Sequence, residues 1–174
     1  MTQQSISISF YEKSLTKLLP LTFLSSNNFL TNAFNLYFCS KFLKKNLIHK
    51  YEILSNLTGY QQINKQLWYI VVYNFLSTSL NKKLNLKILI ENKQSLTSIS
   101  SIYFNSNWFE RELWDLLGIF FSNHPDLRRI LTDYAFEGHP LDKTFPLMGY
   151  VEYHYSDQET RLIPSLISFS QNFR

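Results

Sequence analysis

Three segments in the middle of the chain carry the hydrophobic pattern of β-strands. In the segment from Lys83 to Glu91, leucine or isoleucine at positions 84, 86, 88 and 90 alternates with a wetter face. The segment from Leu67 to Ser77 begins with seven consecutive apolar or aromatic residues, which predicts a central strand. Lys50 to Thr58 is a third strand, and Asn81-Lys82 is the expected hairpin turn between the last two strands. The pattern predicts an antiparallel meander.

The first part of the chain reads as helical. A short helix from Tyr11 to Leu19 is expected to end at Pro20, and Leu21 to Ser25 is a strand candidate. A second helix is predicted from an Asn28 cap to Lys44-Lys45, where lysines suit the negative end of the helix dipole. Its periodic apolar positions are Leu30, Ala33, Phe34, Tyr37, Phe38 and Phe42. We expect core packing to explain these aromatic residues.

The clearest helix signal begins at Asn107. Asn107 is a cap residue, Glu110 stands where its side chain reaches back to the cap, and Gly118 is placed to end the helix. The predicted apolar face is Phe109, Leu113, Leu116 and Leu117. The opposite face is Glu110, Arg111, Glu112 and Asp115, with Arg111 and Asp115 as an i,i+4 pair. Two short helices are also predicted, from Thr97 to Phe104 and after Pro125.

From Thr132 onward, glycines and prolines interrupt the chain so often that it builds no core of its own. Two alternating pieces, Tyr150 to Tyr155 and Thr160 to Ile163, are expected to add strands to a neighbour. The predicted fold class is α+β: a mixed or antiparallel sheet with packed helices, followed by a long extended C-terminal segment. The predicted division is an α+β domain over residues 1–131 and an extended segment over residues 132–174 that docks on partners.

Composition narrows the class of protein. The length of 174 residues suits one compact domain with a tail, and a hydrophobic share of 45% argues against disorder over most of the chain. No apolar run approaches the roughly 18 residues of a membrane-spanning helix, so no direct membrane span is expected. The single cysteine, Cys39, excludes a disulfide framework and a multi-cysteine cluster held by this chain alone. Cys39 lies in a helical apolar pattern and is expected to be buried.

The residue usage indicates an A/T-rich gene. There are 15 phenylalanines and 11 tyrosines but 4 glycines, and only Ala33 and Ala135 are alanine. The favoured residues have A/T-rich codons, and an organellar genome is one natural home for such a gene. The segment from Met1 to Ser25 contains no arginine and no signal-peptide pattern, so no import signal is expected.

Charge is polarised along the chain. Residues 1–109 hold eleven lysines and three glutamates, a net charge of +8, while residues 110–174 hold six basic and ten acidic residues, a net charge of −4. A basic half with many aromatic residues leaves open an alternative, a basic RNA-binding organellar protein. No single stripe of lysine and arginine emerges, however, so the pattern argues against nucleic acid as a partner.

Motifs for catalysis or metal binding are weak. The histidines at 49, 124, 139 and 154 and the aspartates at 126, 133 and 142 do not have the i,i+4 spacing of a helical zinc site, and a metal site is not predicted. Glu110, Glu112 and Asp115 could act as acid and base, but a solvated helix face neutralised by Arg111 is the favoured interpretation. No phosphate loop and no Gly-x-Ser-x-Gly elbow is present. The residues therefore indicate no catalytic, cofactor-binding or metal-binding group.

A contiguous motif in the second half of the chain carries a family resemblance. The run from Glu110 to Phe121, followed by His124 to Leu131, resembles the thirty-kilodalton subunit of respiratory complex I, the proton-pumping NADH:ubiquinone oxidoreductase. The likeness continues through Thr132-Asp133-Tyr134, Phe136 to Leu141, Phe145-Pro146-Leu147 and Gly149-Tyr150-Val151-Glu152. Two positions depart from the family pattern, which usually has a basic residue in place of Asp142 and an acidic residue in place of Thr144.

This resemblance implies a cofactor-free structural subunit of the matrix-side peripheral arm at the mitochondrial inner membrane. It implies a hetero-oligomer in which the chain packs against the forty-nine-kilodalton subunit, while NADH, FMN, iron–sulfur clusters and ubiquinone bind elsewhere in the complex. With the codon bias, it implies a gene in the mitochondrial genome. The motif residues expected to hold the extension and dock it on partners are Glu110, Arg111, Glu112, Asp115, His124, Pro125, Asp126, Arg128, Arg129, Asp133, Gly138, His139 and Pro140.

Overall fold

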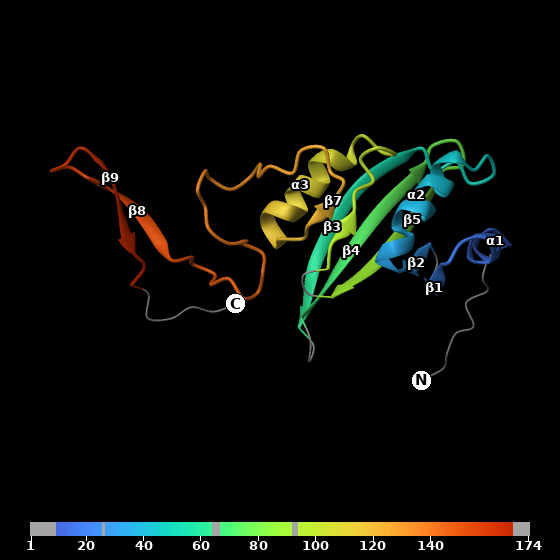
Figure 1. Ribbon diagram of the computed structural model, residues 1–174, viewed down its shortest axis with the longest axis horizontal. Coiled ribbons are helices and arrows are strands. Elements are labelled where there is room, and N and C mark those ends of the chain that lie inside the picture. The colour runs from blue at the N-terminus through green and yellow to red at the C-terminus, as the bar shows by residue number, and fades with distance from the viewer. Residues whose placement is uncertain (1–9, 26, 64–66, 92–93, 169–174) are drawn as a thin grey trace.

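The computed structural model of the chain describes residues 10–25, 27–63, 67–91 and 94–168 (Figure 1). Its elements are α1 (Phe10–Leu18), β1 (Thr22–Ser25), β2 (Asn28–Thr31), the 3-10 turn η1 (Ala33–Asn35), α2 (Leu36–Lys45), β3 (Ile53–Ile63), β4 (Leu67–Ser77), β5 (Lys82–Glu91), β6 (Leu96–Thr97), α3 (Ser106–Leu117), β7 (Phe121–Ser122), β8 (Val151–Ser156) and β9 (Arg161–Leu166).

The main sheet has five strands in the order β1-β2-β5-β4-β3. Strands β3, β4 and β5 form the predicted antiparallel meander, whereas β2 pairs with β5 in parallel. The sheet is therefore mixed, and the predicted α+β class is confirmed. β4 has the predicted bounds and lies inside the sheet, although β5 is the middle strand. The two strands are joined at Asn81, whose φ of 48° is typical of a tight turn.

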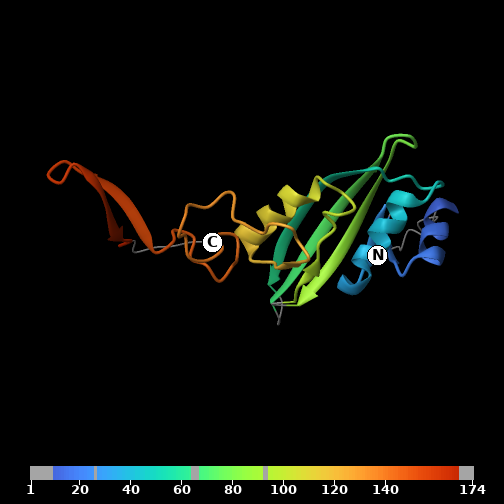
Figure 2. The ribbon, with the colours of Figure 1, turned by 45° about the horizontal axis from the view of Figure 1, so that its top comes forward.

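One face of this sheet forms the core. Side chains at alternate positions of β4 and β5, such as Tyr73 and Leu86, are fully buried, as the two-residue period of a strand requires. From the helices, α2 contributes Leu36, Cys39 and Leu43 to this core. Both α2 and α3 lie on the same side of the sheet in two views (Figures 1 and 2). The predicted burial of Cys39 is confirmed.

The predicted helix from Asn28 to Lys45 is wrong over its first eight residues, where a strand and a 3-10 turn precede the helix. Asn28–Thr31 is strand β2, and the helix proper is Leu36–Lys45. Phe29 and Thr31 point into the core in alternation, and β2 bonds both to β1 and to the edge of β5. Pairing with a sheet edge outweighs a local helical pattern, since tertiary contacts override weak propensities.

The two short helices predicted beside α3 are also absent. Residues Leu96–Thr97 instead form β6, which pairs with β7 in parallel, and the following serines turn the chain. After Pro125 the chain runs without a helix to Leu131. In both places side chains bind backbone N–H groups that a helix would have used, which favours turns over helix.

Helix α3 is present, with small differences at its ends. It begins at Ser106 after Asn105, slightly before the predicted Asn107 cap, and Asn105 makes no side-chain capping bond. It ends at Gly118 as predicted, because Gly118 adopts the left-handed conformation with φ of 75° and donates its N–H to the carbonyl of Trp114.

Close packing of α3 on β3 depends on Gly59. A Cβ atom at Gly59 would lie 2.9 Å from Leu117 Cδ1 and 3.1 Å from Leu113 Cδ2. We expect Gly59→Val to force the helix outward and to lower the free energy of unfolding by about 1–3 kcal/mol, measured by urea denaturation. Thr58→Val is the control, because Thr58 is exposed on the other face of the same strand. Equal loss in both variants would contradict direct contact at Gly59.

Beyond β7 the chain leaves the sheet. It folds back along α3 and then forms the hairpin β8–β9, which lies apart from the main body at the far end of the molecule (Figure 1). The two predicted C-terminal strands are confirmed, and within this chain they pair with one another. Within the described residues, no helix is long and apolar enough to cross a membrane.

Candidate partner-binding site

Helix α3 presents two fully buried carboxylates rather than a solvated acidic face. Glu110 and Asp115 are both inaccessible to solvent, whereas Arg111 and Glu112 are half-buried. The predicted solvated face is therefore wrong for two of its four residues. The loops on either side of the helix cover these two carboxylates and hydrogen-bond to them, so each carboxylate fixes a loop to α3.

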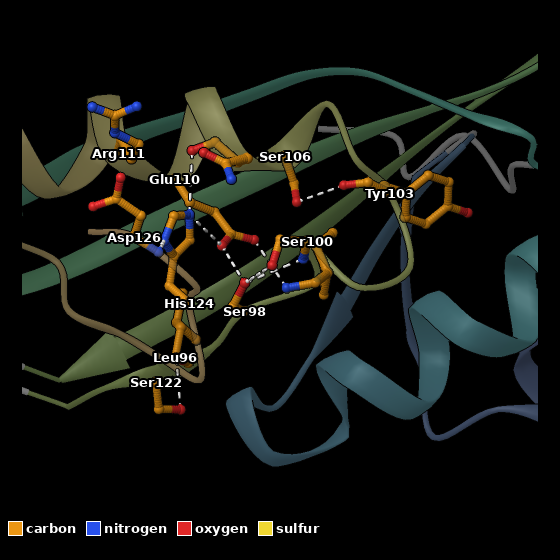
Figure 3. Close-up of polar contacts among 12 residues, drawn as sticks. Leu96, Ser98, Ser100, Tyr103, Ser106, Glu110, Arg111, Ser122, His124 and Asp126 are labelled. Carbon is orange, nitrogen blue, oxygen red and sulfur yellow. Dashed lines mark hydrogen bonds and ion pairs between the residues drawn. The ribbon is translucent and has the colours of Figure 1, made fainter. Parts of the chain in front are cut away.

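Glu110 holds the loop that precedes α3 (Figure 3). Its carboxylate accepts a hydrogen bond of 2.5 Å from the Ser98 hydroxyl and one of 2.9 Å from the Ile99 N–H. Burial raises the pKa of Glu110 to about 7, against the lowering effect of the bonds from Ser98, Ile99 and Ser106. Glu110 therefore does not reach back to the helix cap as predicted, and it titrates near neutral pH.

His124 lies beside this carboxylate. Its Nε2 is 3.8 Å from a Glu110 oxygen and 3.3 Å from the carbonyl oxygen of Asn107, and its Nδ1 accepts the N–H of Asp126 at 3.1 Å. That acceptor role places the proton of the neutral ring on Nε2. Burial lowers the pKa of His124, with a smaller contribution from the nearby Arg111 charge. His124 and Glu110 therefore do not form a fully charged ion pair at neutral pH, and the ring is held by its bonds to Asn107 and Asp126.

Tyr73 reaches the same buried region from β4. Burial raises its pKa well above the ordinary value, and the Glu110 charge raises it further. Its hydroxyl is buried and has no hydrogen-bond partner among the described residues. The sheet therefore supplies an uncharged wall behind Glu110.

Asp115 holds the segment that follows β7. One carboxylate oxygen accepts the N–H groups of Ile130, Leu131 and Thr132 at 3.1, 2.7 and 3.0 Å. The other accepts the Thr132 hydroxyl at 2.6 Å and lies 3.8 Å from Arg129. Burial raises the pKa of Asp115, but these hydrogen bonds outweigh it and hold the pKa below the ordinary value. One carboxylate thus fixes three successive residues where the extension begins.

Two arginines of the motif, Arg111 and Arg128, form no ion pair with Glu110 or Asp115 in the structure. Arg111 packs its guanidinium over the Trp108 ring, 5.0 Å from the centroid, and donates its Nε–H to the carbonyl of Arg128. The predicted pair between Arg111 and Asp115 is not formed. Arg128 instead pairs with Asp126 at 2.7 Å, with both side chains accessible to solvent. Their contact lowers the pKa of Asp126 and raises the pKa of Arg128.

His139 fixes the extension at the C-terminal end of α3. Its Nδ1 lies 3.0 Å from the carbonyl oxygen of Asp115, and its ring packs against Trp114 at 5.5 Å between centroids. The ring also covers Gly118, where a Cβ atom would lie 2.6 Å from it. Glycine is needed at position 118 both for its positive φ and for this close approach.

Two further contacts tie the extension to the main body. Leu141 donates its N–H to the carbonyl of Leu116, and Lys143 donates its N–H to the Gln61 side chain at 2.7 Å. Gln61 lies on β3, so the extension reaches the sheet as well as α3.

The two positions expected to depart from the family pattern contact one another. Asp142 accepts both the N–H and the hydroxyl of Thr144, at 2.9 and 3.0 Å, and also the Tyr69 hydroxyl at 3.1 Å. Burial raises the pKa of Asp142, but these bonds together with Gln61 bring it below the ordinary value. In this chain the carboxylate of Asp142 therefore has hydrogen-bond donors from the chain itself.

The remaining motif residues make fewer contacts. Gly138 has a φ of 101° and lies against the Phe145 ring, and Pro140 borders a cavity of about 490 Å³ lined by Phe136, Phe145 and Tyr150. Glu112 is half-buried on α3, while Pro125 and Asp133 are exposed. The structure thus gathers Glu110 with His124 and Asp115 with Arg129 and His139, but leaves these others apart.

The arrangement is suited to holding the chain rather than to chemistry. Its carboxylates are saturated by hydrogen bonds from the chain itself and are closed off from solvent, so a substrate would have to displace those bonds. Among the described residues, no group of three histidine, cysteine, aspartate or glutamate side chains could hold a metal ion. Sequence reasoning found the carboxylates but missed their partners Ser98, Thr132, Tyr69 and Gln61.

Comparison with known proteins identifies relatives over most of the chain. The family described as respiratory-chain NADH dehydrogenase, 30 Kd subunit, matches residues 31–151. NADH dehydrogenase (ubiquinone) iron-sulfur protein 3 of Beta trigyna is 43% identical over 148 residues, which cover 85% of this chain and 77% of that protein. NADH-ubiquinone oxidoreductase subunit 9 of Prototheca wickerhamii is 42% identical over 133 residues, which cover 76% of this chain and 69% of that protein.

A solved structure shares the fold. A chain in the structure of the membrane-bound sulfane sulfur reductase, an archaeal respiratory membrane complex, aligns with a TM-score of 0.66. The alignment covers 78% of this chain and 84% of that chain at 18% sequence identity. At that identity the likeness supports the fold alone.

Proposed function

The chain belongs to the family of the 30 Kd subunit of respiratory-chain NADH dehydrogenase, and from this premise we propose that it is a structural subunit of the peripheral arm of the proton-pumping NADH:ubiquinone oxidoreductase. The resemblance carried by the motif is confirmed by these relatives. The chain supports assembly of the quinone-reducing module and docks on the forty-nine-kilodalton subunit and its neighbours. NADH, FMN, iron–sulfur clusters and ubiquinone are bound by other subunits of the complex.

The absence of a cluster on this chain is supported by its one cysteine. Cys39 is fully buried in the core, and its sulfur lies 4.0 Å from the Thr31 hydroxyl. Burial raises the pKa of the Cys39 thiol, which disfavours the thiolate that a cluster iron would need. In the proposed complex this chain is therefore a scaffold beside clusters held by other subunits.

The exposed hairpin is the observation that carries the docking role. A two-stranded hairpin alone is marginally stable in water, and large apolar patches on a surface indicate contact with a partner. Six apolar or aromatic side chains at the hairpin are between 44% and 80% exposed: Tyr150, Val151, Tyr153, Tyr155, Leu162 and Leu166. We propose that residues 1–131 are the folded domain and that residues 132–174 dock on partner subunits, with the hairpin as the outermost contact.

The motif divides into two roles under this proposal. Asp115, which is buried, and His139, which is half-buried, hold the extension on α3, and Glu110 holds the loop that precedes the helix, so all three act on docking indirectly. Arg128 and Asp126 form an exposed pair, which contributes little to the stability of an isolated chain. Their side chains are accessible to a partner, so we assign them to direct docking.

Removal of residues 150–167 is expected to abolish assembly without unfolding the main body. The hairpin strands pair only with each other among the described elements, so the core loses no strand. Blue-native electrophoresis of membranes with an NADH activity stain should show loss of at least about 90% of the full complex, as expected when the large apolar anchors of an interface are removed. Urea unfolding of the isolated chain should keep its midpoint.

The matched control changes the turn that joins the two strands. Replacement of Asp157 and Gln158, both exposed, by asparagine and glycine keeps the hairpin and its apolar side chains, so assembly should be normal. Normal assembly of the deletion variant would contradict the docking role. A wild-type chain that does not migrate with the NADH activity at all would contradict the proposed function itself.

The proposed location is the matrix side of the mitochondrial inner membrane, with the gene in the mitochondrial genome. The location is supported by the family. The position of the gene in the mitochondrial genome is supported by the residue usage, which favours residues that have A/T-rich codons. Protease treatment of isolated mitochondria should leave the chain intact until the inner membrane is opened. Digestion before that point would contradict the location.

A further inference from the structure

Helix α2 turns an aromatic surface toward solvent. Its inner face is Leu36, Cys39, Ser40 and Leu43, all fully buried. On the outer side, Phe34 in the 3-10 turn η1 that leads into the helix is 86% exposed, and Phe38 and Tyr37 on α2 are 58% and 38% exposed. These three rings were expected in the core, but the helix begins at Leu36 and its phase is set by the residues that meet the sheet. Packing in the core of this chain therefore does not explain why aromatic residues stand at these three positions.

Lysines continue this face toward the C-terminal end of the helix. Lys41, Lys45 and Lys50 are exposed, and Lys41 lies 5.9 Å from the centroid of the Tyr37 ring. Lys44 is held by the chain itself, against the carbonyl of Ile102 and the Tyr103 ring. Residues 32–51 contain no aspartate or glutamate, and no described carboxylate forms an ion pair with the three exposed lysines. The positive charge is left to an outside partner.

The surface is divided along its length. Its N-terminal half is aromatic, its C-terminal half is basic, and Leu47 and Ile48 beside the lysines are 82% and 69% exposed. Phe34 in η1 and Phe38 on α2 both expose their rings, so they offer apolar surface against which the side chains of a second helix can pack. Exposed apolar groups next to unpaired charge are typical of a protein interface.

We propose that this face of α2 docks an acidic amphipathic helix of another polypeptide in the assembly. Apolar side chains of that helix would pack between Phe34 and Phe38, and its carboxylates would pair with Lys41 and Lys45. A second copy of this chain is disfavoured, because it would bring lysines against lysines. Nucleic acid is disfavoured because Leu47 and Ile48 offer nothing to phosphates and residues 1–109 contain no arginine.

The inference goes beyond the proposed function, because it concerns a different surface. In Figures 1 and 2, α2 lies over β2 and β5, while the extension and its hairpin lie at the other end of the molecule. A partner on α2 can therefore bind at the same time as partners on the hairpin. Failure of one docking surface leaves the other intact.

The test uses the assembled complex purified from membranes. Treatment with a carbodiimide joins lysines directly to carboxylates that touch them, and mass spectrometry locates the joined residues. We expect Lys41 or Lys45 to be joined to an aspartate or glutamate in another polypeptide, within a segment whose acidic and apolar residues follow helical spacing. Acetylation of the same two lysines by an N-hydroxysuccinimide ester should be at least about tenfold slower in the complex than in the isolated chain. Lys83, at the start of β5, is the reference lysine.

A double variant tests the apolar half. Phe34→Ser with Phe38→Ser should leave the melting temperature of the isolated chain unchanged, because both rings are exposed, and should remove the crosslink. Leu80→Ser, at a 40% exposed leucine in the β4–β5 turn, is the matched control and should keep it.

Four results would overturn the inference. The first two are equal acetylation of Lys41 and Lys45 in the complex and the isolated chain, and a crosslink only to a second copy. The other two are salt-sensitive retention of RNA by the wild-type chain that the double variant loses, and binding of the wild-type chain to phosphatidylserine vesicles that the double variant loses, without any protein crosslink. In each case the proposed function stands as long as the chain migrates with the NADH activity.

Discussion

Replacement of Asp115 by asparagine is expected to lower the free energy of unfolding by about 2–4 kcal/mol, because buried backbone donors lose a charged acceptor. One Asp115 oxygen accepts three successive N–H groups, from Ile130 to Thr132, and the other accepts the Thr132 hydroxyl. Asparagine keeps one carbonyl oxygen but turns an NH₂ group toward donors. The first segment of the extension should therefore detach from α3.

The measurement is hydrogen exchange of these amides together with urea unfolding. In wild type the three amides should exchange slowly, and in Asp115→Asn they should exchange as fast as an unfolded segment. Asp126→Asn is the control, because Asp126 belongs to the same motif but is solvent-accessible and forms its ion pair with Arg128. Unchanged protection of the three amides in Asp115→Asn would show that the carboxylate does not hold the segment.

The pH dependence of this contact has a definite sign. The folded pKa of Asp115 is depressed, so its stabilisation is present above the unfolded pKa, near 3.8, and is lost as the pH falls through the folded pKa. At neutral pH the contact is complete. In cells, Asp115→Asn should reduce assembly of the complex more than turnover per assembled complex, since we propose a holding role for Asp115 and no cofactor site on this chain.

Strands β4 and β5 were predictable because their apolar side chains repeat every two residues, a pattern that a helix does not produce. β4 and β5 have the predicted bounds to within one residue, since Val71, Tyr73 and Phe75 alternate inward over a single buried face. β2 was not predictable, because four residues starting at Asn28 carry no strand pattern of their own. Its conformation comes from β5, a partner far away in the chain.

The candidate site was predictable in its residues but not in their environment. The motif from Glu110 to Asp115 has the composition of an exposed helix face, and charged runs usually are exposed. What buries these residues is the chain on either side: Ser98 before the helix and Thr132 after it. Neither partner has a spacing from α3 that a helical or strand period would reveal. The one available signal was that Ser98 and Thr132 are residue types whose side chains compete with a helix for backbone hydrogen bonds.

The same reasoning explains the error on α2. Phe34, Tyr37 and Phe38 have helical spacing, which fixes that they share a face but not which face meets the sheet. Leu36, Cys39 and Leu43 also share a face, and these residues, whose side chains are smaller, pack in the core. An aromatic stripe therefore predicts a surface to be covered, either by the chain itself or by a partner.

Glu110 is expected to make the stability of the chain fall as the pH rises from 4.5 to about 7. Its folded pKa of about 7 lies above the ordinary value of 4.5, so the folded state binds the proton more tightly than the unfolded state. The stabilisation from the protonated form is complete below 4.5 and is lost as the pH rises to about 7. This difference corresponds to about 3 kcal/mol. The lowered pKa of His124 acts in the opposite sense, because stability is lost as the pH falls below 6.5.

Glu110→Gln separates the two effects, because glutamine keeps an acceptor for the Ile99 N–H and carries no charge. Between pH 5 and pH 8 the wild-type free energy of unfolding should fall by about 2–3 kcal/mol relative to this variant, measured by urea denaturation at each pH. Glu112→Gln removes a carboxylate from the same helix without touching the cluster, so its curve should run parallel to that of wild type. If the Glu110→Gln curve is parallel as well, Glu110 does not titrate in this range, and its burial would have to be compensated by hydrogen bonds alone. A steeper fall in wild type would instead establish that α3 is held to the loop at Ser98 by a carboxyl group that is largely protonated under mildly acidic conditions.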